Sequence, residues 1–315
     1  STRQMATIGG FLAGGSGGIG SLRHGMLRDP GNVTYVKVVT VEPEPQVIEL
    51  HGEDIQKVQH AYGTNGIVVE IGLALTEATD WIHTAALFDG YDKALDFATT
   101  AQVEGFDCYL LTTVERRFAP YYTKFGDFFP DDRDAVFAMV APGEMARFQA
   151  EAERMGGRVS FAMTKPEIRK AGLQPAYECG WNHTTLQALK VDKGWTYLQV
   201  AYPRPFDPEL VMRQMARYGD ELFWHHEMAR MDGEIQIFAL PLVRYRGKEE
   251  TYRLIRELEE IDGCTIFDPH VVTIEDGGMK TIDDTQIAFK KLADPYGLMN
   301  PGKTRGWSAD MARAD

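Results

Sequence analysis

Glycines crowd the segment from Gly9 to Gly25, which reads G-G-F-L-A-G-G-S-G-G-I-G-S-L-R-H-G. Glycine permits positive φ and lets a ligand approach main-chain N–H groups, so such a segment is suited to wrap a phosphate or a flat cofactor. Gly15 to Gly20 also match G-x-G-x-x-G, the turn that binds dinucleotides between a strand and a helix. The sequence predicts neither flanking element, which disfavours an NAD-dependent dehydrogenase. A flexible linker or a hairpin is the remaining alternative for the glycines.

His183 is the first candidate for proton transfer. It lies in a polar and aromatic stretch with Tyr177 and Trp181, and a histidine placed there could accept the hydroxyl proton of an alcohol. An equally weighted alternative makes His183 part of a helix start that Asn182 or Thr184 caps.

His226 is the second candidate catalytic residue, in the string His225-His226-Glu227 near the end of an expected strand. Alternation along a strand puts His225 and Glu227 on one face. A solvated strand edge is the favoured interpretation of this string. Four more side chains could line a substrate pocket or serve only in packing: Arg116, Arg117, Tyr121 and Tyr122.

Composition excludes several classes of function. The net charge of −13 over 315 residues argues against nucleic acid and anionic membranes as partners, although local arginines and lysines can still bind a small anionic substrate. Cys108, Cys179 and Cys264 are isolated in sequence, so thiolate metal sites are not expected and a reducing compartment fits. No apolar run approaches the ~20 residues of a membrane-spanning helix, and no signal peptide is evident. We expect a cytoplasmic protein.

Periodicity predicts two kinds of region. Residues 1–78 read as a mixed, glycine-punctuated region with strands at 33–41, 45–50 and 66–75 and a short helix at 54–62. From residue 79 to 282, a strand–helix–strand pattern recurs four times. Its elements are expected at 81–88, 89–104 and 106–114; at 135–141, 143–155 and 157–163; at 195–202, 207–218 and 220–228; and at 234–241, 247–261 and 263–267. Residues 283–315 begin with a helix to 293, which leads into N-P-G-K, and the tail after Trp307 is expected to be disordered. This order predicts an α+β fold whose ferredoxin-like units place helices on one face of an antiparallel sheet.

Three strings resemble the vanillyl-alcohol-oxidase family of FAD-linked oxidases, whose flavin domain is of the PCMH type. T-I-G-G with G-S-G-G-I-G-S-L-R-H-G resembles the second lobe of that domain. Gly63-Thr64-Asn65-Gly66-Ile67-Val68 resembles the segment that closes it around the nucleotide. D-P-Y-G-L-M-N-P-G-K, from Asp294 to Lys303, resembles the family's C-terminal signature.

The resemblance implies an FAD site and names its residues. Main-chain groups of the T-I-G-G string would face the pyrophosphate, the later glycines would approach the isoalloxazine ring, and arginines would offset phosphate charge. The implied cofactor-binding residues are Thr7, Ile8, Gly9, Gly10, Gly17, Gly18, Gly20, Arg23, Arg28, Gly66, Ile67, Asn300 and Lys303. Hydroxy-acid members of the family can carry a metal near the substrate, for which His225 and Glu227 are the best available ligands. His270 lies where relatives have E-H-G-x-G, but Pro269 replaces the glutamate.

The family's N-terminal flavin lobe is not found in this sequence. We therefore expect that lobe to be supplied either by the same gene or by a partner chain. The function implied is oxidation of a CH–OH group of a small alcohol or 2-hydroxy acid, with hydride passing to flavin N5. A non-catalytic ligand-binding module on a ferredoxin-like sheet is the alternative. A homodimer is possible on sequence grounds.

Overall fold

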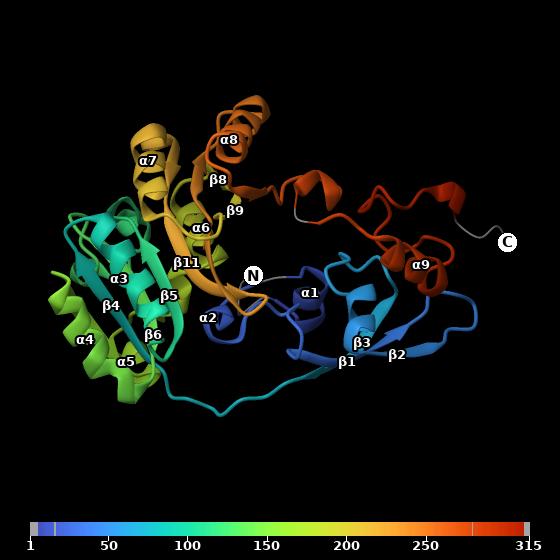
Figure 1. The fold of residues 1–315 in the computed structure, drawn as a ribbon, viewed down its shortest axis with the longest axis horizontal. Coiled ribbons are helices and arrows are strands. Elements are labelled where there is room, and N and C mark those ends of the chain that lie inside the picture. Colours follow the sequence, from blue (N-terminus) through green and yellow to red (C-terminus); the bar gives the residue numbers. More distant parts are fainter. Residues whose placement is uncertain (1–5, 16, 279, 312–315) are drawn as a thin grey trace. The chain divides into compact units, whose positions relative to one another are not determined.

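The computed structural model describes residues 6–15, 17–278 and 280–311. The chain divides into two compact units (Figure 1). The smaller comprises residues 1–17, 26–77 and 267–315, and the larger comprises 18–25 and 78–266. The larger unit therefore takes residues 18–25 from the glycine segment, and it ends before residue 282, the boundary expected from sequence.

The smaller unit is built on a three-stranded antiparallel sheet in the order β2-β1-β3. Its strands are β1 (Val33–Val39), β2 (Val47–His51) and β3 (Ile67–Leu73), and its helices are α1 (Ile8–Ala13) and α9 (Asp284–Ala293). Leu12 of α1 and Phe289 of α9 pack with Val36 and Val38 in one buried core. This core brings the start and the end of the chain onto one sheet.

The larger unit contains two ferredoxin-like units in one eight-stranded sheet, which confirms the α+β expectation. The strand order is β14-β9-β12-β11-β5-β6-β4-β7. The first unit runs β4 (Ile82–Phe88), α3 (Tyr91–Val103), β5 (Cys108–Val114), β6 (Asp134–Val140), α4 (Met145–Arg154) and β7 (Arg158–Met163). The second runs β9 (Gln199–Ala201), α7 (Pro208–Tyr218), β11 (His225–Met231), β12 (Glu234–Ala239), α8 (Lys248–Glu260) and β14 (Thr265–Phe267).

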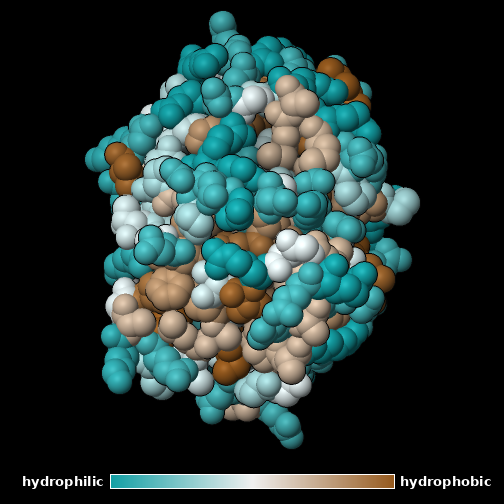
Figure 2. Space-filling view, turned by 90° about the vertical axis from the view of Figure 1, so that its left-hand side faces the viewer, coloured by the Kyte–Doolittle hydropathy of each residue, from teal (hydrophilic) through white to brown (hydrophobic). Residues whose placement is uncertain are grey.

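Antiparallel pairing of β5 with β11 joins the two ferredoxin-like units within the larger unit. Helices α3, α4, α7 and α8 share one hydrophobic core with the sheet and so cover the same face. The opposite face carries Phe137, which packs against Tyr122 and Phe125. Two short helices, α2 (Ser21–His24) and α5 (Lys165–Lys170), and α6 (Asn182–Val191) complete the larger unit. Seen from the side of α4 and α5, its surface is mainly hydrophilic, with apolar residues gathered in the lower half (Figure 2).

Several expected strands are interrupted. The strand expected at 195–202 is β8 (Trp195–Tyr197) followed by β9, and β8 joins β10 (Leu222–Phe223) and β13 (Leu242–Arg244) in a separate three-stranded sheet. The strand expected at 220–228 is likewise divided: the fully buried Trp224 separates β10 from β11, which belong to different sheets. The expectation of unbroken strands was wrong because each of these chain segments passes from one sheet to another.

The helix expected at 54–62 is also wrong in its second half. A 3₁₀ helix spans Gly52–Lys57, and His60 and Tyr62 then take positive φ values of 52° and 50°. Their N–H groups donate to the carbonyls of Leu12 and Ala13 at the end of α1, 3.1 and 2.9 Å away. These tertiary hydrogen bonds replace helical ones.

Candidate functional site

Three of the sequence strings singled out above come together within the smaller unit. The first is α1 with its T-I-G-G start, the second is the loop at 60–66, and the third is the C-terminal signature at 294–303. Besides the two bonds to α1, the loop receives one from Asn300, whose Nδ2 donates to the Tyr62 carbonyl at 2.6 Å. Asn300 itself has a φ of 43°, a conformation that asparagine tolerates better than most residues.

Lys290 provides the strongest link between the loop and the signature. The residue is 1% exposed, and Nζ donates to the Thr64 carbonyl at 2.9 Å and to Asp294 Oδ2 at 2.8 Å. Asp294 also accepts the N–H groups of Leu298 and Met299, each at 2.9 Å. The aspartate of the signature therefore shapes its own turn and neutralises a buried lysine.

Gly66 and Ile67 occupy the start of β3. Gly66 has a φ of +83°, and a Cβ there would lie 2.6 Å from Val38 Cγ1, so close packing onto β1 requires the glycine. Asn65 donates to the carbonyls of Lys57 and Gln286 at 2.7 and 2.9 Å. The loop is thus rigidly held by side chains, and Ile67 is left 46% exposed.

The T-I-G-G string forms the first turn of α1. Thr7 caps that turn, its Oγ1 accepting the Gly10 N–H at 3.1 Å, which leaves that amide engaged within the protein. Ile8 is exposed, and a Cβ on Gly9 would meet no atom within 4 Å. Lys303 lies at the end of the signature, where its carbonyl accepts from Ile274 N at 3.0 Å.

The later glycines and Arg23 have partners inside the larger unit. Gly20 has a φ of +94°, and a Cβ there would lie 2.8 Å from the Tyr109 ring. Gly18 N donates to Ser21 Oγ at 3.0 Å. Arg23 forms an ion pair with Asp107. Close approach by Tyr109 already accounts for Gly20, whereas the expectation attributed it to the isoalloxazine ring. Gly17 lies at the end of the smaller unit's first segment.

His60 is a site residue that sequence reasoning missed. It is 7% exposed, and within the described residues neither ring nitrogen has a hydrogen-bond partner. Burial, with help from the charges of Lys280 and Arg28, lowers its pKa to about 4. A signal was present, because His60 precedes the Gly63 string by three positions, but its left-handed backbone depends on tertiary contacts.

The larger unit concentrates buried ionisable groups where β5 pairs with β11. Glu227 is fully buried opposite Thr112 and accepts from Trp181 N at 2.5 Å and Thr112 Oγ1 at 2.9 Å. Its second oxygen, Oε2, has no partner within the described chain. Burial raises the pKa of Glu227 to about 8. His225, on the same face, has Nε2 3.2 Å from the Trp181 carbonyl, and burial lowers its pKa to about 3.

These two side chains hold the Trp181 peptide in an unusual conformation. Trp181 has a φ of 51°, which is strained for a bulky residue, and it is the residue before α6. His183 then lies in the first turn of α6, buried, with Nδ1 3.3 Å from the Gly180 carbonyl. The expected helix start is present, but neither Asn182 nor Thr184 is its N-cap residue, since Trp181 takes that position.

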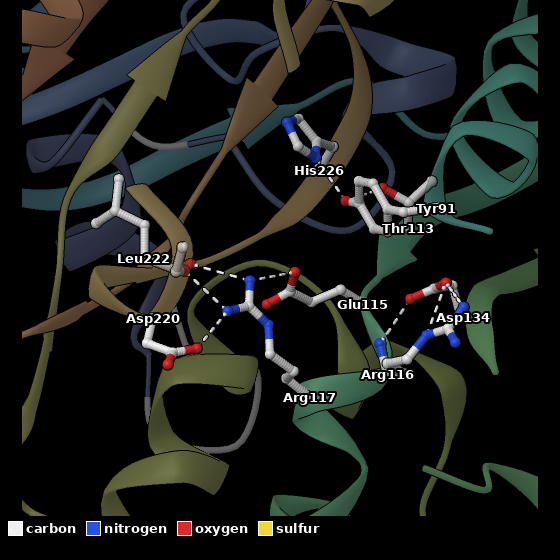
Figure 3. A network of polar contacts seen from close by, with 10 residues as sticks. Tyr91, Thr113, Glu115, Arg116, Arg117, Asp134, Asp220, Leu222 and His226 are labelled. Atoms are coloured by element: carbon white, nitrogen blue, oxygen red, sulfur yellow. Dashed lines mark hydrogen bonds and ion pairs between the residues drawn. The ribbon is translucent and has the colours of Figure 1, made fainter. Parts of the chain in front are cut away.

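His226 points to the opposite, helix-covered face. Its Nδ1 lies 2.6 Å from Tyr91 Oη and its Nε2 lies 3.0 Å from Tyr202 Oη, and Tyr91 also contacts Thr113 at 2.8 Å (Figure 3). Burial lowers the pKa of His226 to about 3. Both ring nitrogens are therefore used in the core, and the geometry favours a structural role over the expected catalytic one.

The arginines considered for a substrate pocket are paired instead (Figure 3). Arg116 binds Asp134 at 2.5 Å, and Arg117 binds Glu115 at 2.8 Å. Tyr121 Oη accepts from Trp195 Nε1 at 2.9 Å, and Tyr122 Oη donates to the Cys179 carbonyl at 3.1 Å. These four side chains stabilise loops around the sheet. His270 is exposed, and its backbone N–H donates to Asp268 Oδ1 at 2.9 Å.

Residues 6–15, 17–278 and 280–311 contain neither a metal-binding cluster of His, Cys, Asp or Glu side chains nor a membrane-spanning helix. None of the groups of three or more His, Cys, Asp or Glu side chains is placed to hold a metal ion, so His225 and Glu227 lack a third ligand of these types. None of the helices in these residues is long and apolar enough to cross a membrane.

Comparison with solved structures identifies the fold. Two crystal forms of alkyldihydroxyacetonephosphate synthase are similar to this chain. The P212121 form has a TM-score of 0.63 at 12% identity, over 95% of this chain and 57% of the synthase chain. The P1 form has a TM-score of 0.61 at 12% identity, over 94% and 58%. This chain thus spans a little over half the length of these relatives. Comparison of its sequence with family models and with curated proteins gives no match.

Proposed function

We propose that this chain forms part of the cofactor and substrate sites of an FAD-dependent oxidoreductase. One observation carries the proposal. The strings 63–68 and 294–303, which resemble the flavin-oxidase family, are joined within the smaller unit by Lys290 and Asn300, and residues 60–62 bond to the end of α1, the helix that the string 7–10 opens. Strings far apart in sequence that meet in one place are expected of a shared ligand site. The synthase-like fold supports the same interpretation.

The residues present fit a flavin nucleotide. The partnerless imidazole nitrogens of His60 are buried polar atoms of the kind that a bound group satisfies. The open space around Gly9 leaves room for close approach to the main chain. We assign contacts with FAD to Thr7, Ile8, Gly9, Gly10, Gly66, Ile67, Asn300 and Lys303. When bound, FAD supplies a hydride acceptor.

The proposed reaction is oxidation of a CH–OH group in a small alcohol or 2-hydroxy acid. We assign the role of proton acceptor for the hydroxyl group to His183, whose position at the start of α6 is set by Trp181. Glu227 and His225 act through that peptide as positioning residues, because they bond to its N–H and carbonyl.

Flavin binding tests the proposal directly. The purified chain is titrated with FAD while flavin fluorescence and the visible spectrum are followed, and saturable quenching with a red-shifted spectrum is expected. Substrate candidates are then scored by flavin bleaching without oxygen. The panel contains primary alcohols, 2-hydroxy acids and a dihydroxyacetone phosphate derivative, the last because of the name of the similar synthase. Failure to bind FAD contradicts the proposal, and binding without any reduction favours the non-catalytic alternative.

His183→Gln tests the assigned base. We expect at least about a hundredfold loss in the rate of flavin reduction, since general-base catalysis contributes 10²–10⁴-fold, with little change in FAD affinity. His51→Gln is the matched control, because His51 is an exposed residue of β2. Equal reduction rates in the two variants remove His183 from the mechanism.

A further inference from the structure

His60 is held in a conformation that histidine does not adopt cheaply. Its φ of 52° lies in the left-handed region, which costs about 1–2 kcal/mol for a residue other than glycine. The Leu12 carbonyl holds its N–H at 3.1 Å, and the Ala13 carbonyl holds that of Tyr62 at 2.9 Å. The fold therefore tolerates a strained backbone conformation at His60, which keeps this imidazole beside the end of α1.

The imidazole lies directly against the main chain of the glycine segment. A Cβ on Gly15 would lie 2.6 Å from His60 Nδ1 and closer still to Cβ and Cγ of the same side chain. Only glycine is compatible with this approach. The His60 side chain therefore occupies the space that a Gly15 side chain would fill.

Both ring nitrogens remain without a hydrogen-bond partner in the described chain, although His60 is 7% exposed. A neutral imidazole has one donor and one acceptor to satisfy, and leaving buried polar groups unpaired costs about 1–3 kcal/mol for each group. A buried histidine that serves only packing normally finds partners, as His226 does with two tyrosines. His60 therefore has the properties of a residue whose partner is a ligand.

The charges around His60 indicate an anionic ligand. Lys280 and Arg28 both act on the imidazole as positive charges. Lys280 is partly buried and donates to the Gln59 carbonyl, next to His60 in sequence, at 3.4 Å. Two cations beside a neutral imidazole form a field that favours negative charge.

We propose that His60 is a phosphate-binding residue: its imidazole donates a hydrogen bond to a diphosphate group lying along Gly14 and Gly15, in the positive field of Lys280 and Arg28. That the diphosphate belongs to FAD rests on the proposed function, whereas the phosphate chemistry does not. Anion binding raises the affinity of the imidazole for a proton, so the ligand and a proton bind together as pH falls.

The test uses the whole chain with three probes: inorganic pyrophosphate, ADP and FAD. Affinities are measured by calorimetry for the unmodified protein, His60→Asn and the control His51→Asn. Asparagine tolerates the left-handed backbone better than most residues, and thermal unfolding shows whether each variant is folded. We expect His60→Asn to bind ADP at least about tenfold more weakly, the cost of one charge-assisted hydrogen bond, and His51→Asn to bind it normally. Lys280→Met should weaken pyrophosphate binding as well.

Carbon-13 labelling of the imidazoles distinguishes phosphate binding by His60 from a purely structural role, because only binding changes the His60 signal when ligand is added. The His60 Cε1–H signal should shift on saturation with ADP, and its midpoint of titration should move to higher pH. A His60 signal that stays unchanged at saturation, or equal affinities in the two asparagine variants, overturns the proposal. Binding of pyrophosphate and ADP without FAD leaves His60 as the phosphate residue and contradicts the flavin assignment. Absence of binding for all three probes overturns both.

Discussion

At the level of single residues, Gly20 and Gly31 illustrate two different reasons why a position requires glycine: a positive φ alone, or a positive φ together with a close contact. Both have a positive φ, +94° and +96°, but a Cβ on Gly31 would meet nothing within 4 Å, whereas one on Gly20 would meet Tyr109 at 2.8 Å. Gly31→Ala should cost about 1 kcal/mol of unfolding free energy from backbone strain. Gly20→Ala should cost about 2 kcal/mol more, because overpacking is added.

Urea unfolding of both variants measures this difference. Adding Tyr109→Ala should lower the cost of Gly20→Ala and leave that of Gly31→Ala unchanged, since only the first involves the ring. If the two alanine substitutions lower the unfolding free energy equally, Tyr109 does not explain Gly20. Close approach of the isoalloxazine ring would then be the favoured explanation.

At the scale of elements, Lys290 joins α9 to the loop at 60–66 and to the C-terminal signature. Lys290→Met removes one partner of a buried ion pair and leaves Asp294 without its cation, which typically costs 3–5 kcal/mol. We expect a loss of about that size and faster amide exchange at 63–66 and 294–300. The measurements are urea unfolding and hydrogen exchange.

Lys291→Met is the matched control, because Lys291 is the next residue of α9 and is exposed. Its effect should stay within about 0.5 kcal/mol, as for most surface substitutions. If the two variants unfold alike, Lys290 does not connect these elements energetically.

The elements that could be predicted from sequence are those with local signals. Helix α7 was expected within one residue, because Asp207 accepts the Glu209 N–H, Pro208 opens the helix and Gly219 follows it. The break at Trp224 could not be foreseen, since it depends on which sheet each strand joins. The same holds for part of the site, because Lys290 also bonds to Thr64 and His60 packs against Gly15. These partners are more than 40 positions away in sequence, and the periodicity of a single sequence does not reveal such contacts.

At the scale of the whole molecule, buried ionisable groups make stability depend on pH in both directions. His225 and His226 have folded pKa values of about 3 against 6.5, so the unfolded chain binds more protons and stability falls as pH drops from 6.5 towards 3. Glu115 and Glu227 have folded pKa values of about 7 and about 8 against 4.5. For them the folded state binds more protons, and stability falls as pH rises from 4.5 towards 8.

These opposing slopes predict maximum stability of the larger unit near about pH 5–6, and Glu227→Gln isolates the alkaline side. Glutamine keeps an oxygen for Trp181 N and Thr112 Oγ1 and cannot ionise, so the variant should lose less stability between pH 5 and pH 8 than the unmodified protein. The difference amounts to up to about 4 kcal/mol, from about 1.4 kcal/mol per unit of pKa shift.

Glu260→Gln, at an exposed position of α8, should follow the unmodified protein. Urea unfolding at the two pH values decides: parallel behaviour of Glu227→Gln and the unmodified protein would mean that Glu227 ionises in the folded state as easily as in the unfolded one. Trp181, and His183 beyond it, would then be held by a carboxylate rather than by a carboxylic acid.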